Sequence, residues 1–145
     1  MSYNIEQANS GFLSLTAAGL AEGTNSATFK TTNTLTFTSN GIFKSKAATD
    51  NLTFTAGTAL AASQACLFAV WITSGGTVST TQGPIVAADD PCPVPGQVTA
   101  NTTLVGLIKV TTSSAATFTP GTTDLSATGI TDTFSDCMDM PGSAQ

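Results

Sequence analysis

Threonine alternates with apolar residues along much of this chain, and that alternation constrains the fold more than any other feature. In the segments 27–31 and 34–38, apolar side chains stand two residues apart with threonines between them. Successive side chains of a strand point to opposite faces of the sheet, so this spacing predicts strands with one buried and one wet face. β-Branched threonine suits a pleated surface. The outer face of such a sheet is rich in hydroxyl groups and almost uncharged.

The rest of the chain continues this pattern. Residues 66–73 and 103–111 are apolar at consecutive positions, which is typical of central strands, and residues 58–65 form either a helical turn or a loop. Turn residues recur at the spacing of a sandwich or barrel, and helical signatures are nearly absent. We therefore predict one all-β domain, with further short strands at 51–55, 77–80, 85–87 and 116–119.

Asn40-Gly41 predicts a hairpin between two of these strands. A two-residue loop places Phe37 opposite Lys44. A three-residue loop that includes Ser39 places Phe37 opposite Phe43. The second register pairs apolar with apolar, so we favour it.

The two ends of the chain lack the strand period. We predict an extended N-terminal arm over residues 1–24, with a weak helical turn around Ala17 to Ala21, a β-sandwich over 25–134 and a tail over 135–145. Packing of the ends on a neighbouring molecule and packing on their own domain both remain open. The candidate partner-contact residues are the apolar ones in these ends: Ile5, Phe12, Leu13, Leu15, Met138 and Met140.

The charge content argues against several classes of partner. Charged residues are 9% of the chain, against roughly 25% in a typical domain, and the net charge is −5. The cations are four lysines, without arginine or histidine, so we expect neither nucleic-acid nor anionic-membrane binding. The opening residues lack a basic region followed by an apolar run, so we expect no signal peptide and synthesis in a cytoplasm.

Few residue types suited to catalysis are present. Without histidine, the usual base for a serine or cysteine nucleophile is missing, and Lys109 is expected to point outward from its strand. We therefore expect no enzyme activity and no cofactor. An enzyme that uses carboxylates alone is the remaining catalytic alternative.

No metal site is expected either. Two acidic groups, Asp89-Asp90 and Asp132 with Asp136 and Asp139, fit solvated loops better than calcium, since neither has EF-hand spacing. Cys66 is expected to be buried, and a Cys92–Cys137 disulfide is disfavoured in a reducing compartment.

Several segments resemble short virion proteins of tailed bacteriophages. They are 28–33, 45–51, 106–110 and 118–125. Together these segments resemble the head cement, or decoration, proteins of the Bordetella-phage type. The resemblance implies a jelly-roll-like β-sandwich on the outside of an icosahedral phage head, where it bridges major capsid protein subunits. It also implies a homo-oligomer, with a homodimer favoured. The alternative function is a phage fibre or host-surface module that binds glycans.

Overall fold

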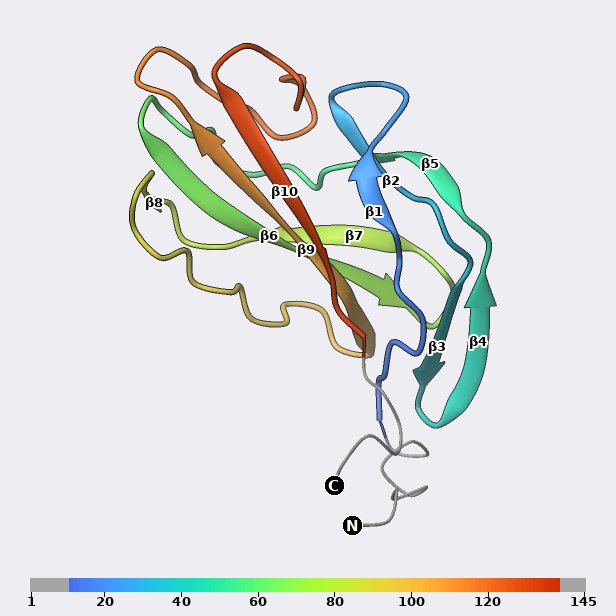
Figure 1. Cartoon of the computed structure of the whole chain (residues 1–145). Coiled ribbons are helices and arrows are strands. Elements are labelled where there is room, and N and C mark those ends of the chain that lie inside the picture. Colours follow the sequence, from blue (N-terminus) through green and yellow to red (C-terminus); the bar gives the residue numbers. More distant parts are fainter. Residues whose placement is uncertain (1–10, 139–145) are drawn as a thin grey trace, which may run out of the picture.

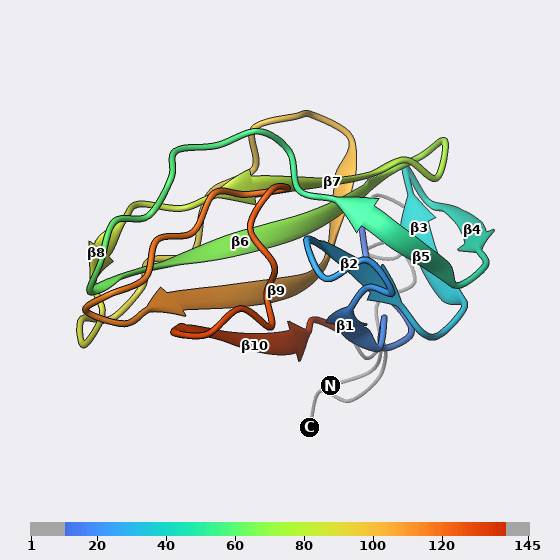
Figure 2. The ribbon, with the colours of Figure 1, turned by 90° about the horizontal axis from the view of Figure 1, so that it is seen from above.

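The computed structural model describes residues 11–138, and this part of the chain folds into ten strands without a helix (Figure 1). All the strand pairs are antiparallel, and buried side chains fill the space between two layers of sheet (Figure 2). The predicted all-β class is confirmed, and the architecture is that of a β-sandwich. The strands are β1 (Leu20–Glu22), β2 (Thr28–Thr31), β3 (Leu35–Ser39), β4 (Ile42–Lys46), β5 (Thr49–Thr53), β6 (Gln64–Thr73), β7 (Val78–Gln82), β8 (Val86–Ala87), β9 (Thr102–Thr112) and β10 (Ile130–Asp136).

The larger sheet has the strand order β10-β9-β6-β7, with β8 paired to the start of β6. Its two inner strands, β6 and β9, are the two apolar runs that were predicted to be central. A bulge at Val105 interrupts their register, because Val70 pairs with Gly106 while Trp71 pairs with Leu104. The bulge brings Val105 into the core.

The smaller layer consists of the three-stranded sheet β1-β2-β5 and the separate two-stranded β3–β4 hairpin. Ser14 pairs with Phe37 on β3, and the Leu15 N–H donates to the Thr36 carbonyl at 2.8 Å. Residues 11–24, the described part of the predicted N-terminal arm, are therefore paired with their own domain. The predicted helical turn around Ala17 is wrong, since Gly19 has a φ of +63° and β1 begins at the next residue.

The hairpin has the two-residue loop, so the predicted three-residue loop is wrong. Ser39 pairs with Ile42 and Phe37 with Lys44, so Asn40-Gly41 alone forms the loop. Both loop residues have positive φ, at +50° and +74°. This turn matches the right-handed twist of the flanking strands, and the preference outweighed apolar pairing.

Four phenylalanines join the two layers. The Phe54 ring lies 5.1 Å from the rings of Phe29 and Phe68, and 6.1 Å from that of Phe118, each in an edge-to-face arrangement. Phe29 comes from β2 and Phe68 from β6, whereas Phe54 and Phe118 come from connecting segments. The long connections between strands thus contribute directly to the core.

The strand predicted at 51–55 is displaced to Thr49–Thr53, and the strand predicted at 116–119 is absent. β5 ends at Thr53, and Phe118 forms only an isolated bridge, with Leu60. The backbones of Leu60 and Phe118 exchange two hydrogen bonds, of 2.8 and 3.0 Å. Residues 58–63 are a loop. The alternation around Phe54 and Phe118 reflects their burial in the core rather than extended sheet pairing.

The two layers approach closely at Gly106. A Cβ atom there would lie 2.2 Å from Leu20 Cδ1 and 2.8 Å from the Ser135 carbonyl oxygen. Nearby, the buried Thr103 hydroxyl donates to the Thr38 carbonyl at 3.0 Å. Both contacts fix the smaller layer against β9.

Candidate interaction surfaces

The outer face of the larger sheet is an almost uncharged surface of hydroxyl and apolar groups. On β6, Phe68 and Val70 face the core, so the alternate residues face outward, and the register carries this alternation across the sheet. The residues of this outer face are Leu67, Trp71, Ser79, Thr81, Leu104, Leu107, Lys109, Thr111, Thr131, Thr133 and Ser135, and Ala69 lies among them fully buried. The alternating segments 27–31 and 34–38 correspond instead to β2 and β3 outside this sheet, where Thr28, Thr31 and Thr38 are buried, so the wet threonine face predicted for them is wrong.

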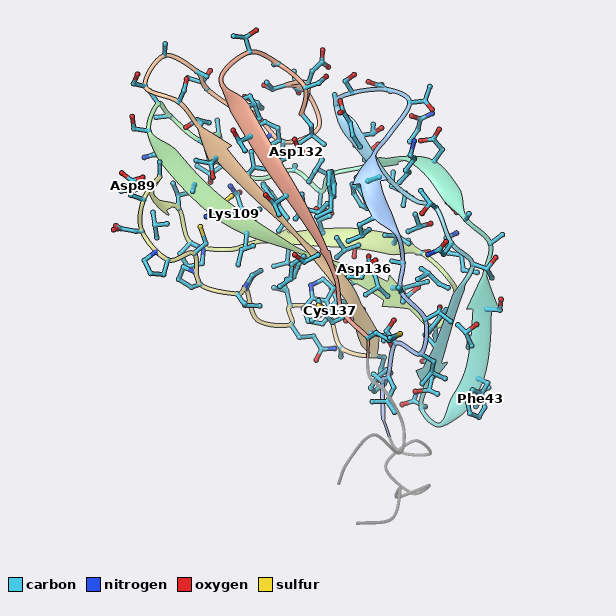
Figure 3. All side chains as sticks on the ribbon, viewed as in Figure 1. Phe43, Asp89, Lys109, Asp132, Asp136 and Cys137 are labelled. Carbon is cyan, nitrogen blue, oxygen red and sulfur yellow. The ribbon has the colours of Figure 1, made fainter. Side chains whose placement is uncertain are left out.

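Lys109 is the one charged residue of this outer face. Its neighbours across the strands are Leu67 and Thr133. It is half-buried between the buried Ile108 and Val110, so the prediction that it points away from the core is confirmed (Figure 3). The Trp71 indole is also half-buried there, and its N–H is buried without a hydrogen-bond partner.

The β3–β4 hairpin exposes two large apolar side chains. Ile42 is 60% exposed and Phe43 is 68% exposed. They are followed on β4 by Lys44 and Lys46, and the hairpin lies at one end of the molecule (Figure 1). The predicted pairing of Phe43 with the core residue Phe37 is wrong, and Phe43 is a surface residue that pairs with Thr38. The preference of Asn-Gly for two-residue hairpin loops was the signal that would have predicted the exposure of Phe43.

A proline-rich loop, residues 88–101, forms another surface. Pro95 is buried, and a Cβ at Gly83 would lie 2.9 Å from the Pro93 carbonyl, so the loop packs against the end of β7. Val94 is 58% exposed, and Asp89 and Asp90 are exposed. The fixed φ of its prolines makes this loop a stiff acidic surface.

Asp136 joins the edges of the two layers. Its carboxylate accepts hydrogen bonds from the N–H groups of Gly19 and Leu20, each at 3.0 Å. This residue therefore has a structural partner in β1 and is not part of a free acidic tail.

Asp132 lies in a different environment on the same strand. It alternates with Ile130 and Phe134, which pack against the core, so its side chain faces inward from the edge strand. Burial, and to a smaller extent repulsion from Glu22, raise the pKa of Asp132. One buried oxygen of Glu22 has no hydrogen-bond partner. An inward-facing charge on an edge strand opposes pairing with another chain.

Asp50 has the opposite pKa shift. Its carboxylate accepts hydrogen bonds from the Thr24 hydroxyl and the Thr24 N–H, and these hold the pKa of Asp50 below its usual value. Within residues 11–138, no three His, Cys, Asp or Glu side chains gather in a way that would hold a metal ion. Asp139 lies outside the described residues.

The cysteines have separate surroundings. Cys66 is fully buried, as predicted, and burial raises the pKa of its thiol to about 11. Cys92 carries a free thiol, so no Cys92–Cys137 disulfide is formed.

The predicted partner-contact residues are placed as follows. Leu13 and Leu15 are half-buried beside β3, Phe12 is half-buried, and Met138 is 44% exposed. Ile5 and Met140 lie outside the described residues. Of this set, Met138 is therefore the most accessible in the described part.

Comparison with known proteins gives no family model, no curated protein and no solved structure that matches this chain. The part of the chain that the structure describes has no helix of the length and hydropathy that crossing a membrane requires. The surfaces themselves therefore carry the functional argument.

Proposed function

We propose that this protein is a structural virion protein that binds the outer surface of an icosahedral phage head and stabilises contacts between major capsid protein subunits. The observation that carries the proposal is the outer face of the larger sheet, which presents hydroxyl and apolar groups with Lys109 as its one charge. Such a face loses little hydration energy when it lies against another protein, because few charges must be desolvated.

The segments that resemble phage cement proteins support the same proposal. Under it the sandwich has a jelly-roll-like character, is made in the host cytoplasm, joins the assembled head and associates as a homodimer. Binding to many equivalent sites on a shell gives avidity without a tight individual interface. The low positive charge of the chain suits a position outside the packaged genome.

Purified protein mixed with undecorated heads of the parent phage tests this proposal. Saturable, stoichiometric binding and a higher melting temperature of the particle are the expected results. Absence of binding to these heads would overturn the proposal. A glycan array run beside it tests the fibre or host-surface alternative, which predicts carbohydrate binding instead.

A pair of single substitutions tests the outer face itself. Thr133 is exposed on β10 and belongs to this face, and Thr122 is exposed in the connection that leads to β10. Thr133→Glu places a charge in the proposed interface, so it should weaken head binding by at least about tenfold. Thr122→Glu, with the same change of charge, should bind like the unmodified protein. Equal binding by both variants would exclude this face as the contact.

A further inference from the structure

The proline-rich loop holds three prolines at alternate positions, Pro91, Pro93 and Pro95. The ring of each proline fixes its φ at about −65°, and each residue before a proline is restricted to extended conformations. Every residue from 90 to 95 is therefore under one of these two restrictions. The segment lies outside the strands, so the prolines rather than sheet pairing set its shape.

The burial of these residues repeats every three positions. Cys92 is half-buried and Pro95 is buried, whereas Pro91, Pro93 and Val94 are exposed. A strand with period two would place the three prolines on one face, but their burial differs. A polyproline II helix has three residues per turn, so it places Cys92 and Pro95 on one side and Pro91 and Val94 on another. The burial pattern therefore indicates a short polyproline II helix.

One side of this helix packs against the larger sheet. A Cβ atom at Gly83, which directly follows β7, would lie 2.9 Å from the Pro93 carbonyl oxygen and 3.3 Å from Pro95 Cδ. Figure 1 shows the loop along the edge of the molecule, between β8 and the start of β9. The opposite side of the helix is therefore directed away from the sandwich.

Hydrogen bonds hold the loop on both sides of the helix. Before it, the Asp90 N–H donates to the Ala87 carbonyl at 3.0 Å. After it, the Gln97 side-chain amide donates to the Thr102 hydroxyl at 3.0 Å. The helix is thus ordered before a partner arrives, and little conformational entropy is lost on binding.

The outward side combines apolar rings with acidic groups. Pro91, Pro93 and Val94 are exposed, and Val94 is 58% exposed. Asp89 and Asp90 are exposed immediately before them, and residues 84–101 contain no lysine. The three apolar residues are called the proline ridge.

Proteins that bind polyproline II segments do so with grooves lined by aromatic rings, and the preformed helix costs little entropy. From the shape and charge of this loop we infer that the proline ridge docks into an aromatic-lined groove of a partner protein. A lysine or arginine at the end of the groove would meet Asp89 and Asp90. The inference rests on the proposed function for the identity of the partner, which places the groove on the major capsid protein. The ridge would add a specific contact to the weakly charged outer face of the larger sheet.

A small aromatic cation tests the ridge without a phage head. L-Tryptophanamide carries an indole ring and a positive charge, whereas N-acetyl-L-tryptophan carries the same ring and a negative charge. Titration of the unmodified protein with tryptophanamide should shift the NMR signals of Pro91, Pro93 and Val94, because the indole stacks on the ridge. Acetyltryptophan at the same concentration should give shifts smaller by at least about twofold.

Val98 is the internal control for this titration. It is 77% exposed in the same loop but lies outside the ridge, so unspecific stacking would shift its signals at least as much as those of Val94. Equal shifts of Val98 and Val94 would overturn the inference. In Asp89→Asn/Asp90→Asn, the two probes should give equal shifts. A difference that persists in this variant would exclude these aspartates as the cation contact.

Substitutions in the ridge test the contact with the partner. Pro91→Ala/Val94→Ala removes most of the exposed apolar surface and should weaken binding to undecorated heads by at least about tenfold. The matched control, Pro84→Ala/Val98→Ala, removes one exposed proline and one exposed valine outside the ridge and should bind like the unmodified protein. Thermal unfolding of both variants should show that each remains folded.

The two experiments together separate this inference from the proposed function. If the unmodified protein decorates heads and both double variants bind equally well, the ridge contact is wrong and the proposed function stands. If tryptophanamide selects the ridge but no head is bound, the ridge stands as a docking surface and the proposed function is wrong. If neither probe nor head is bound, both are wrong.

Discussion

Asp136, at the end of β10, accepts a hydrogen bond from the backbone N–H of Leu20 on β1 at 3.0 Å, across 116 residues of sequence. The same carboxylate accepts the N–H of Gly19. Leu20 itself is buried, and its side chain lies over Gly106 on β9. One carboxylate therefore secures the edge strand β1 of the smaller layer near the close approach of Leu20 to Gly106.

Replacing Asp136 by alanine should destabilise the fold. Two backbone N–H groups lose a charged acceptor, which typically costs about 1–3 kcal/mol. Urea denaturation followed by tryptophan fluorescence measures the change. Asp124→Ala, in an exposed loop, removes the same charge and should change the unfolding free energy little. Equal effects of the two substitutions would show that the hydrogen bonds of Asp136 contribute nothing specific.

Replacing Gly106 by alanine should also destabilise the fold, for a steric reason. The new methyl group would meet the Leu20 side chain and the Ser135 carbonyl, and overpacking of this kind costs about 1–3 kcal/mol. Combining Gly106→Ala with Leu20→Ala should cost less than the sum of the two single changes, because the smaller side chain leaves room. A double-mutant cycle measures this coupling. Simple additivity would contradict the contact.

Asp132→Asn should stabilise the protein at pH 7. The folded-state pKa of Asp132 lies above its usual value of 3.8, so ionised Asp132 opposes folding at neutral pH. That penalty is relieved as the pH falls through the folded-state pKa toward 3.8, and it is absent below both values. Thermal unfolding should therefore show a gain for the variant at pH 7 and no gain at about pH 3.

Asp50→Asn supplies the control of opposite sign. The pKa of Asp50 is lowered, so its ionised form stabilises the fold above pH 3.8, and this contribution is lost as the pH falls through the folded-state pKa. The variant should be less stable at pH 7 and match the unmodified protein in strong acid. Parallel pH profiles for the two variants would contradict both assignments.

Cys66 should be unreactive in the folded protein. With a pKa of about 11 and a fully buried side chain, its thiol stays protonated and inaccessible at pH 8. Half-buried Cys92, in the proline-rich loop, should be alkylated by iodoacetamide first. Peptide mapping by mass spectrometry after brief labelling distinguishes the two. Labelling of Cys66 at the rate of Cys92 would contradict its burial.

The sequence predicts the local parts of this fold better than the long-range ones. The runs that became β6 and β9 are unambiguous, because central strands are apolar at nearly every position. The pairing of Ser14 with Phe37 and the hydrogen bonds of Asp136 depend on contacts between distant segments, which no local period encodes. Around Phe54, alternation correctly predicted burial but not where β5 ends.

Local patterns predicted the candidate surfaces less well than the strands. Threonine alternation predicted a wet hydroxyl face for 27–31 and 34–38, but Thr28, Thr31 and Thr38 are buried, and the hydroxyl-rich outer face lies on the larger sheet instead. Ile42 and Phe43 were not recognised as surface residues, because the predicted three-residue loop paired Phe43 with Phe37. In the structure both are exposed.

Phe37 and Phe43 provide the sharpest test of the hairpin register. Phe37 is 1% exposed and belongs to the core, so Phe37→Ala should cost about 3–5 kcal/mol of unfolding free energy. Phe43 is 68% exposed, so Phe43→Ala should change the unfolding free energy by less than about 0.5 kcal/mol. Urea denaturation of both variants measures the difference. The three-residue loop would instead pair the two rings and make both substitutions costly, so a large loss for Phe43→Ala would refute the observed register.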